Sequence, residues 1–192
     1  MYLIAFSFIS VSSLPSYHIA NQIFGMFWVV NAGISSACAI MLGNKLGEGD
    51  IELAKAWGKR FTFLTFGFGL MLGVILFISS SYIPSLFGDV SFEVKRNVTL
   101  ILMAFSFYVP IKFTNAMHII GTLRSGGDTL FAFFAEVVVL WGIGVPLAFI
   151  LSIFTSLPLH IIVAIVNVEE LIKFALVNTR FFTYKWANNL TN

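Results

Sequence analysis

The chain has 192 residues, of which 58% are hydrophobic and 10% are charged, and its mean hydropathy is +0.93. A soluble domain of this size would expose large apolar patches, so the composition indicates an integral membrane protein. The formal net charge of +2 is spread over several segments, which excludes the basic stripe of a nucleic-acid-binding protein. Cys38 is the only cysteine in the sequence, so an intrachain disulfide and a cysteine-based metal site are excluded.

Apolar runs separated by polar segments predict an all-α polytopic membrane helix bundle that forms one domain over residues 1–192. The first run, residues 1–14, is shorter than the roughly 20 residues that cross a bilayer, so we expect a truncated first span. Five runs are long enough to be full spans, at residues 17–43, 61–83, 97–120, 130–154 and 159–178. A polar tail is expected over residues 179–192.

Glycine and proline suggest how these runs pack. Gly69 and Gly73 form a GxxxG pattern, which favours close contact between membrane helices. Pro110 and Pro146 lie inside runs, and each predicts a kink because proline removes a helical hydrogen bond. Between the first two full spans, residues 45–60 are expected to form a polar connection.

A short polar turn at residues 121–129 separates two long apolar runs. Gly126 and Gly127 can adopt positive φ and so end the preceding helix. We expect the Asp128 carboxylate to cap the next helix by accepting its backbone N–H groups. Arg124 can either bridge to Asp128 or bind lipid phosphate.

Charged residues inside predicted spans are costly and are therefore candidates for function. The helical rise of 1.5 Å per residue places all of them in the same half of the bundle. These residues are Lys112, Glu136, Glu169, Glu170 and Lys173.

Two interpretations of these charges remain open. In the structural one, Lys112 pairs with Glu136, and Glu169 pairs with Lys173 one turn later. In the functional one, Glu136 or Glu170 exchanges a proton or sodium, or attracts a cationic substrate.

Neutral polar residues extend both interpretations. Asn115 lies beside the charges and can supply hydrogen bonds along a substrate or ion path. Gln22, in the first full span, either packs between helices or points into a cavity. The histidines lack metal-ligand spacing and there is no phosphate-binding loop, so neither a metal site nor an enzyme is expected.

Basic residues predict the orientation. Eight of the 11 fall on one side of the alternating spans, two fall on the other, and Lys112 lies within a span. By the positive-inside rule the first side is cytoplasmic, so we expect a multi-pass plasma-membrane protein with a cytoplasmic carboxyl terminus.

Several motifs follow one another along nearly the whole chain. The central one is Gly121-x-Leu123-Arg124-x-Gly126-Gly127-Asp128-Thr129, followed by Trp141-x-Ile143-Gly144-x-Pro146-Leu147. Others are Ile19-Ala20-Asn21-Gln22, Gly43-Asn44-Lys45-Leu46-Gly47, Glu170-x-x-Lys173 and Lys185-Trp186. Together they resemble the carboxyl-terminal half of multidrug and toxic compound extrusion (MATE) transporters, with Gly121 to Thr129 at the junction of the tenth and eleventh helices.

The resemblance implies the carboxyl-terminal lobe of an antiporter that exports drugs or toxic organic cations across the lipid bilayer in exchange for sodium or protons. It implies no other cofactor, and it implies a missing amino-terminal lobe, without which this chain is expected to be inactive. Many members place a coupling carboxylate in the first helix, and others use the seventh and tenth helices. The segment matching the tenth helix here carries Lys112 and Asn115 but no acid. The alternatives are a flippase-like transporter of lipid-linked oligosaccharides and a non-transporting truncated membrane protein.

Overall fold

The computed structural model describes residues 1–10, 12–88 and 90–188, and every regular element within them is helical. The predicted all-α bundle is therefore confirmed. The last four residues of the predicted tail, 189–192, lie outside the described residues. Among the described helices, four are long and apolar enough to cross a membrane: Ser13–Gly47, Ile51–Ser79, Phe92–Leu123 and Thr129–Phe154.

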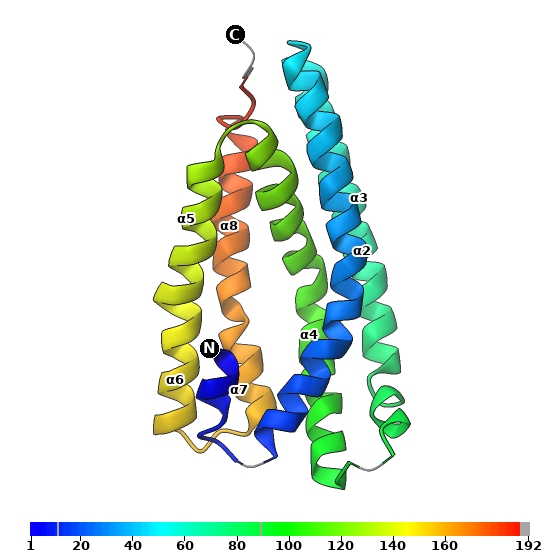
Figure 1. Ribbon diagram of the computed structural model, residues 1–192, viewed down its shortest axis with the longest axis vertical. Helices are drawn as coiled ribbons and strands as arrows, with labels where there is room; N and C mark the ends of the chain where they lie inside the picture. The colour runs from blue at the N-terminus through cyan, green and yellow to red at the C-terminus, as the bar shows by residue number, and fades with distance from the viewer. Residues whose placement is uncertain (11, 89, 189–192) are drawn as a thin grey trace.

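These helices run along the long axis of the bundle (Figure 1). Two of the four each contain a stretch of π-helix. The first half of the chain forms α1 (Tyr2–Phe6), α2 (Ser13–Gly47), α3 (Ile51–Ser79), the 3-10 turn η1 (Ile83–Leu86), α4 (Phe92–Ala116) and the π-helical η2 (Met117–Leu123). The second half forms α5 (Thr129–Val139), the π-helical η3 (Leu140–Gly144), α6 (Val145–Phe154), α7 (Leu159–Val166) and α8 (Val168–Phe182). Pro146 therefore stands at the start of α6, directly after a π-helical turn, where its missing N–H is tolerated.

The expected polar connection at residues 45–60 is wrong, because α2 and α3 run through it and leave only a short turn. Asp50 accepts a hydrogen bond from the Leu53 N–H and so caps α3. Lys45 pairs with Glu48 and Lys55 with Glu52, each three residues apart. These local contacts allow charged residues to extend both helices beyond the apolar runs.

The last predicted span, residues 159–178, is interrupted. Asn167 separates α7 from α8, and its side-chain amide donates to the Val163 carbonyl at 2.7 Å. This bond satisfies a carbonyl at the end of α7. Neither α7 nor α8 alone has the length of a membrane span, so the number of full spans remains a prediction.

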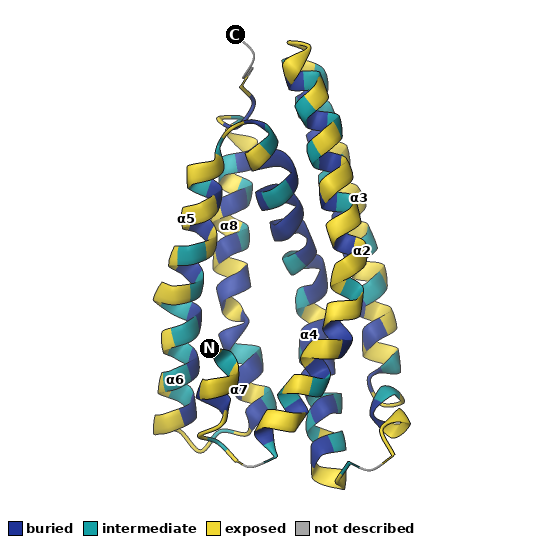
Figure 2. Cartoon of the chain, viewed as in Figure 1, coloured by how far each residue is buried: buried dark blue, intermediate teal, exposed yellow. Residues whose placement is uncertain are grey.

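Helix α4 and its extension η2 lie at the centre of the bundle and contain more buried residues than any other described helix (Figure 2). One apolar core surrounds the first part of α4, as far as Phe113, together with α1, the start of α2 and α7. A second core surrounds η2 from Met117 onward, with the end of α2, α5, α8 and Trp186. Asn115 lies on α4 where one core gives way to the other.

Close contact between α3 and α4 depends on the predicted glycines. A Cβ atom at Gly69 would lie 2.6 Å from the Pro110 Cα, and one at Gly73 would lie 2.6 Å from the Ser106 carbonyl oxygen. No side chain fits at either position, so the GxxxG prediction is confirmed.

Candidate functional site

The turn before α5 is built differently from the prediction. Gly127 has a φ of 82° and supplies the expected left-handed residue, whereas Gly126 is buried against Trp186. Asp128 stands at the cap position of α5, but its carboxylate makes no capping bond. It accepts hydrogen bonds from Arg180 at 2.5 and 3.0 Å, which raise the pKa of that guanidinium. The predicted capping bond, and the bridge from Arg124 to Asp128, are therefore wrong.

The start of the tail folds back onto this turn. Trp186 is fully buried. Its ring stacks on Phe181 with the centroids 5.6 Å apart, and its Nε1 donates to the Phe181 carbonyl at 3.0 Å. Gly58 and Gly126 lie against it and leave room for the indole. The tail thus connects α3, the turn and α8 at one end of the bundle (Figure 1).

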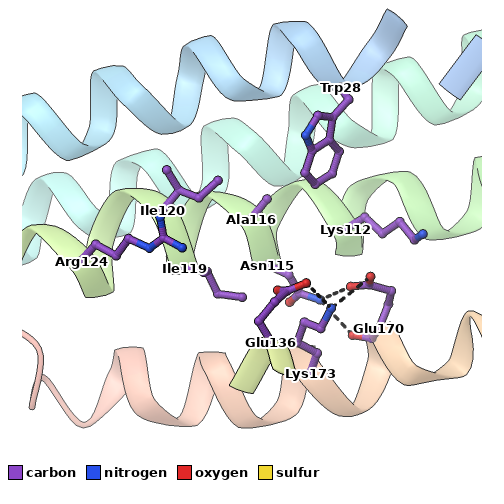
Figure 3. Close-up of a pocket in the computed structure, with 10 residues that line it drawn as sticks. All are labelled: Trp28, Lys112, Asn115, Ala116, Ile119, Ile120, Arg124, Glu136, Glu170 and Lys173. Atoms are coloured by element: carbon purple, nitrogen blue, oxygen red, sulfur yellow. Dashed lines mark hydrogen bonds and ion pairs between the residues drawn. The ribbon is translucent and has the colours of Figure 1, made fainter. Parts of the chain in front are cut away.

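A pocket of about 170 Å³ lies between α4, η2 and α8 and brings together most of the predicted site residues (Figure 3). One group of lining residues is charged or polar, and the other is apolar and includes an aromatic ring. The lining residues are Trp28, Lys112, Asn115, Ala116, Ile119, Ile120, Arg124, Glu136, Glu170 and Lys173.

A hydrogen-bonded ion network forms one wall of the pocket. The Lys173 Nζ lies 3.3 Å from a carboxylate oxygen of Glu136 and 3.3 Å from one of Glu170. The side-chain amide of Asn115 donates to the other Glu170 oxygen at 2.9 Å and to the Glu170 backbone carbonyl at 3.0 Å. These dashed contacts join α4, α5 and α8 in Figure 3.

Burial is uneven across this network. The side chain of Lys173 is 3% exposed and that of Glu170 is 11% exposed, whereas Glu136 is 48% exposed. Glu136 is therefore the carboxylate that water or a solute reaches first. Its single contact with Lys173 is weaker than the set of contacts that holds Glu170.

Lys112 does not pair with Glu136, which corrects the prediction. Its ammonium lies 5.3 Å from the ring centre of Phe24 and 5.6 Å from that of Phe105, a cation–π arrangement. No carboxylate of the described residues lies within ion-pair distance of it. Aromatic faces stabilise a cation without neutralising its charge.

Glu169 is also placed differently from the prediction. It accepts a hydrogen bond from the Tyr2 hydroxyl at 2.8 Å and does not pair with Lys173. Successive residues of a helix point about 100° apart, so Glu169 and Glu170 point in different directions from α8.

The remaining predicted residues separate into two groups. Gln22 is exposed on α2 and does not line the pocket. Gly121 has a packing role, since a Cβ there would lie 2.9 Å from the sulfur of Cys38 on α2. Arg124 is exposed at the end of the pocket nearest the turn (Figure 3).

Sequence reasoning missed the apolar side of the pocket. Trp28 lines it and also contacts the Phe113 ring edge to face. Ile119 and Ile120 belong to η2, where a π-helical turn changes which residues face the pocket. Helical spacing assumes 3.6 residues per turn and carries no signal for such a turn.

Apolar helices of spanning length around a charged pocket define a polytopic membrane protein. The family model described as MatE matches residues 1–150, and the chain therefore belongs to the MatE family. No solved structure matches the chain.

Two curated relatives carry descriptive names. The chain is 27% identical over 152 residues to the "Probable multidrug resistance protein NorM" of Rhodopseudomonas palustris (strain ATCC BAA-98 / CGA009). It is 24% identical over 146 residues to the "Probable multidrug resistance protein YoeA" of Bacillus subtilis (strain 168). Each match covers 76% of this chain but 31% of the relative, so the chain matches about a third of their length.

Proposed function

We propose that this chain is the carboxyl-terminal lobe of a multidrug exporter that exchanges organic cations for sodium or protons. Membership of a transporter family supports the proposal, as do the names of the two relatives. The observation that carries it is the network of Glu136, Lys173 and Glu170 beside an apolar wall. Such a pocket offers both parts of an organic cation a partner: the ring system packs on Trp28, and the charge faces Glu136.

Competition between cations for the Glu136 carboxylate explains how the exchange would work. In the described state Lys173 neutralises this carboxylate at 3.3 Å. A proton, a sodium ion or an organic cation can replace Lys173 as its partner, and only one of these is needed at a time. Mutually exclusive neutralisation of one carboxylate is what antiport requires.

The size of the pocket supports a partner lobe. Sites for drug-sized molecules are commonly about 300 to 1,000 Å³, whereas this pocket is about 170 Å³. We therefore propose that a missing amino-terminal lobe supplies the opposite wall and that the two lobes alternate access to a site between them. This chain alone is then inactive, lies in the plasma membrane and has its carboxyl terminus in the cytosol.

Ethidium efflux from pump-deficient cells tests this proposal. The chain is expressed alone and, separately, joined to whatever coding sequence lies directly upstream. We expect efflux only from the extended form. Efflux from the short chain alone would contradict the lobe assignment, and absence of efflux from both would contradict multidrug export.

A substitution in the extended form tests the role of the pocket. Glu136→Gln removes the accessible carboxylate, and we expect at least a tenfold loss of efflux at unchanged expression. Glu52→Gln is the matched control, because Glu52 is 85% exposed on α3 and lies outside the pocket. Normal efflux from Glu136→Gln would exclude Glu136 from the transport path.

The charges of the pocket favour one alternative substrate class. Three cations, Lys112, Arg124 and Lys173, face two carboxylates, Glu136 and Glu170. A net positive wall suits the pyrophosphate of a lipid-linked oligosaccharide, which a flippase-like transporter would carry. Transport of a fluorescent lipid-linked oligosaccharide in proteoliposomes, without ethidium transport, would establish this function instead.

A further inference from the structure

Glu169 is a buried carboxyl group that the pocket does not use. It lies in the first turn of α8, beside Glu170, and is 4% exposed. The Tyr2 hydroxyl donates to its Oε1 at 2.8 Å. Its Oε2 is also buried and has no hydrogen-bond partner in the described part of the chain. A group with one oxygen bonded and the other bare differs sharply from Glu170, whose two oxygens both have partners.

Glycine creates the space that this carboxyl group occupies. Gly144 ends the π-helical segment η3, and a Cβ on it would overlap both the Glu169 Oε2 and the Tyr2 hydroxyl. The carboxyl group therefore rests directly on the backbone of η3. The site joins three elements, α1, η3 and α8, through one side chain.

No cation of the described residues lies within ion-pair distance of Glu169. Tyr2 of α1 and Tyr17 of α2 face it, and neither carries a positive charge. The cations that influence it are Lys173 of α8 and Lys112 of α4. Lys173 is already held between Glu136 and Glu170, and Lys112 lies over two aromatic rings. Glu170, the adjacent carboxylate, makes a second negative charge here still less favourable.

A metal ion does not suit the site. Hard cations in proteins take several oxygen ligands. Here only the oxygens of Glu169 and Tyr2 converge as side-chain ligands, and the described residues contain no cluster of three or more His, Cys, Asp or Glu residues. A single proton needs one oxygen and no coordination shell.

We propose that Glu169 is a proton-binding site of this lobe. The carboxylate takes one proton from water and becomes a neutral carboxylic acid, so no charge is buried between α1, η3 and α8. The proton binds Oε2, the oxygen without a partner, and Oε1, now a neutral carbonyl oxygen, still accepts the hydrogen bond from the Tyr2 hydroxyl. This proposal rests on the proposed antiport, and the ion that it assigns to Glu169 is the proton rather than sodium.

Infrared spectroscopy of the purified chain in lipid nanodiscs tests whether the proton is present. At mildly acidic pH we expect the C=O absorption of a protonated carboxyl group, and we expect it to disappear as the pH is raised. Glu169→Gln should abolish this band, whereas the control Glu136→Gln should retain it. Adding sodium chloride should leave the band unchanged. A band absent from the parent chain, retained in Glu169→Gln or removed by sodium would overturn the proposal.

A second variant keeps the test valid if Glu169→Gln fails to fold. Tyr2→Phe removes only the hydroxyl that bonds Glu169, so it should shift the frequency of the band without removing it. An unshifted band would mean that the proton lies on another carboxyl group, which contradicts the assignment.

The two proposals fail separately. If the extended protein shows no ethidium efflux while the band behaves as expected, the proton site stands and the export function falls. If the band is missing while efflux is normal, export stands and Glu169 does not bind the proton.

Discussion

Arg180 on α8 donates two hydrogen bonds to Asp128, at 2.5 and 3.0 Å, and so fastens the last turn of α8 to the start of α5. A guanidinium group matches a carboxylate with two parallel bonds, which a lysine cannot reproduce. The two residues are 52 positions apart in the sequence, so the pair closes the bundle at the end where α8 finishes and α5 begins.

Replacing this pair should weaken the fold. We expect Asp128→Asn to lower the free energy of unfolding by about 1 kcal/mol, because Arg180 is partly exposed and water screens the interaction. Thermal unfolding followed by circular dichroism in detergent measures the change. Glu52→Gln is the control, since Glu52 is 85% exposed and water screens its pair with Lys55, and we expect a loss of less than about 0.5 kcal/mol. Equal stability of Asp128→Asn and the parent chain would show that the pair does not stabilise the fold.

Gly69 and Gly73 of α3 should tolerate no side chain. Gly69→Ala and Gly73→Ala each place a Cβ 2.6 Å from the backbone of α4, so α3 and α4 must separate. We expect each to destabilise the chain by about 1 to 3 kcal/mol. Gly67→Ala lies on the same helix with no atom within 4 Å of the added Cβ, and it should be neutral or slightly stabilising. Equal unfolding temperatures for Gly67→Ala and Gly69→Ala would disprove close packing at this interface.

Trp186 should hold the tail in place. Trp186→Ala empties a fully buried site against Phe181 and Gly58, and we expect a loss of about 3 to 5 kcal/mol. Limited proteolysis should then cut the tail sooner, because its only large buried side chain among the described residues after α8 is gone. Trp141→Ala is the control, since that side chain is 51% exposed. A tail that resists protease in Trp186→Ala would contradict this role.

Lys173 should stabilise the fold by neutralising the carboxylates that it contacts. Lys173→Met leaves the buried Glu170 without its cation, and we expect a loss of about 3 kcal/mol. Adding Glu136→Gln and Glu170→Gln should restore most of this stability, because no charge is then left unpaired. If the triple variant is no more stable than Lys173→Met, the loss arises from packing rather than from charge.

The helical fold could largely be predicted from the sequence because a membrane helix is specified by its own consecutive residues. About 20 apolar residues specify a span regardless of its neighbours, and GxxxG specifies a contact face. Helix ends were less readable: capping by Asp50 and ion pairs one turn apart extended α2 and α3 through residues that hydropathy assigns to a loop.

The sequence predicted which residues lie in the candidate site better than it predicted which of them contact one another. Lys112, Asn115, Glu136 and Glu170 do surround one pocket. Depth along a helix follows from residue counting, but the direction of a side chain around the helix depends on interruptions such as η2 and Asn167. For this reason the cation that contacts Glu136 and Glu170 is Lys173, whereas Lys112 lies over two aromatic rings.

The break at Asn167 makes α8 a separate rod whose rotation would act on two acids at once. Glu169 rests on η3 and Tyr2, while Glu170 is bonded to Asn115 and Lys173. Turning α8 about its own axis far enough to free Glu169 from Tyr2 would also pull Glu170 away from Asn115. Binding or loss of a proton at Glu169, on one side of α8, is thus linked by the rigid helix to the position of Glu170 on the other side, where a solute would enter the pocket.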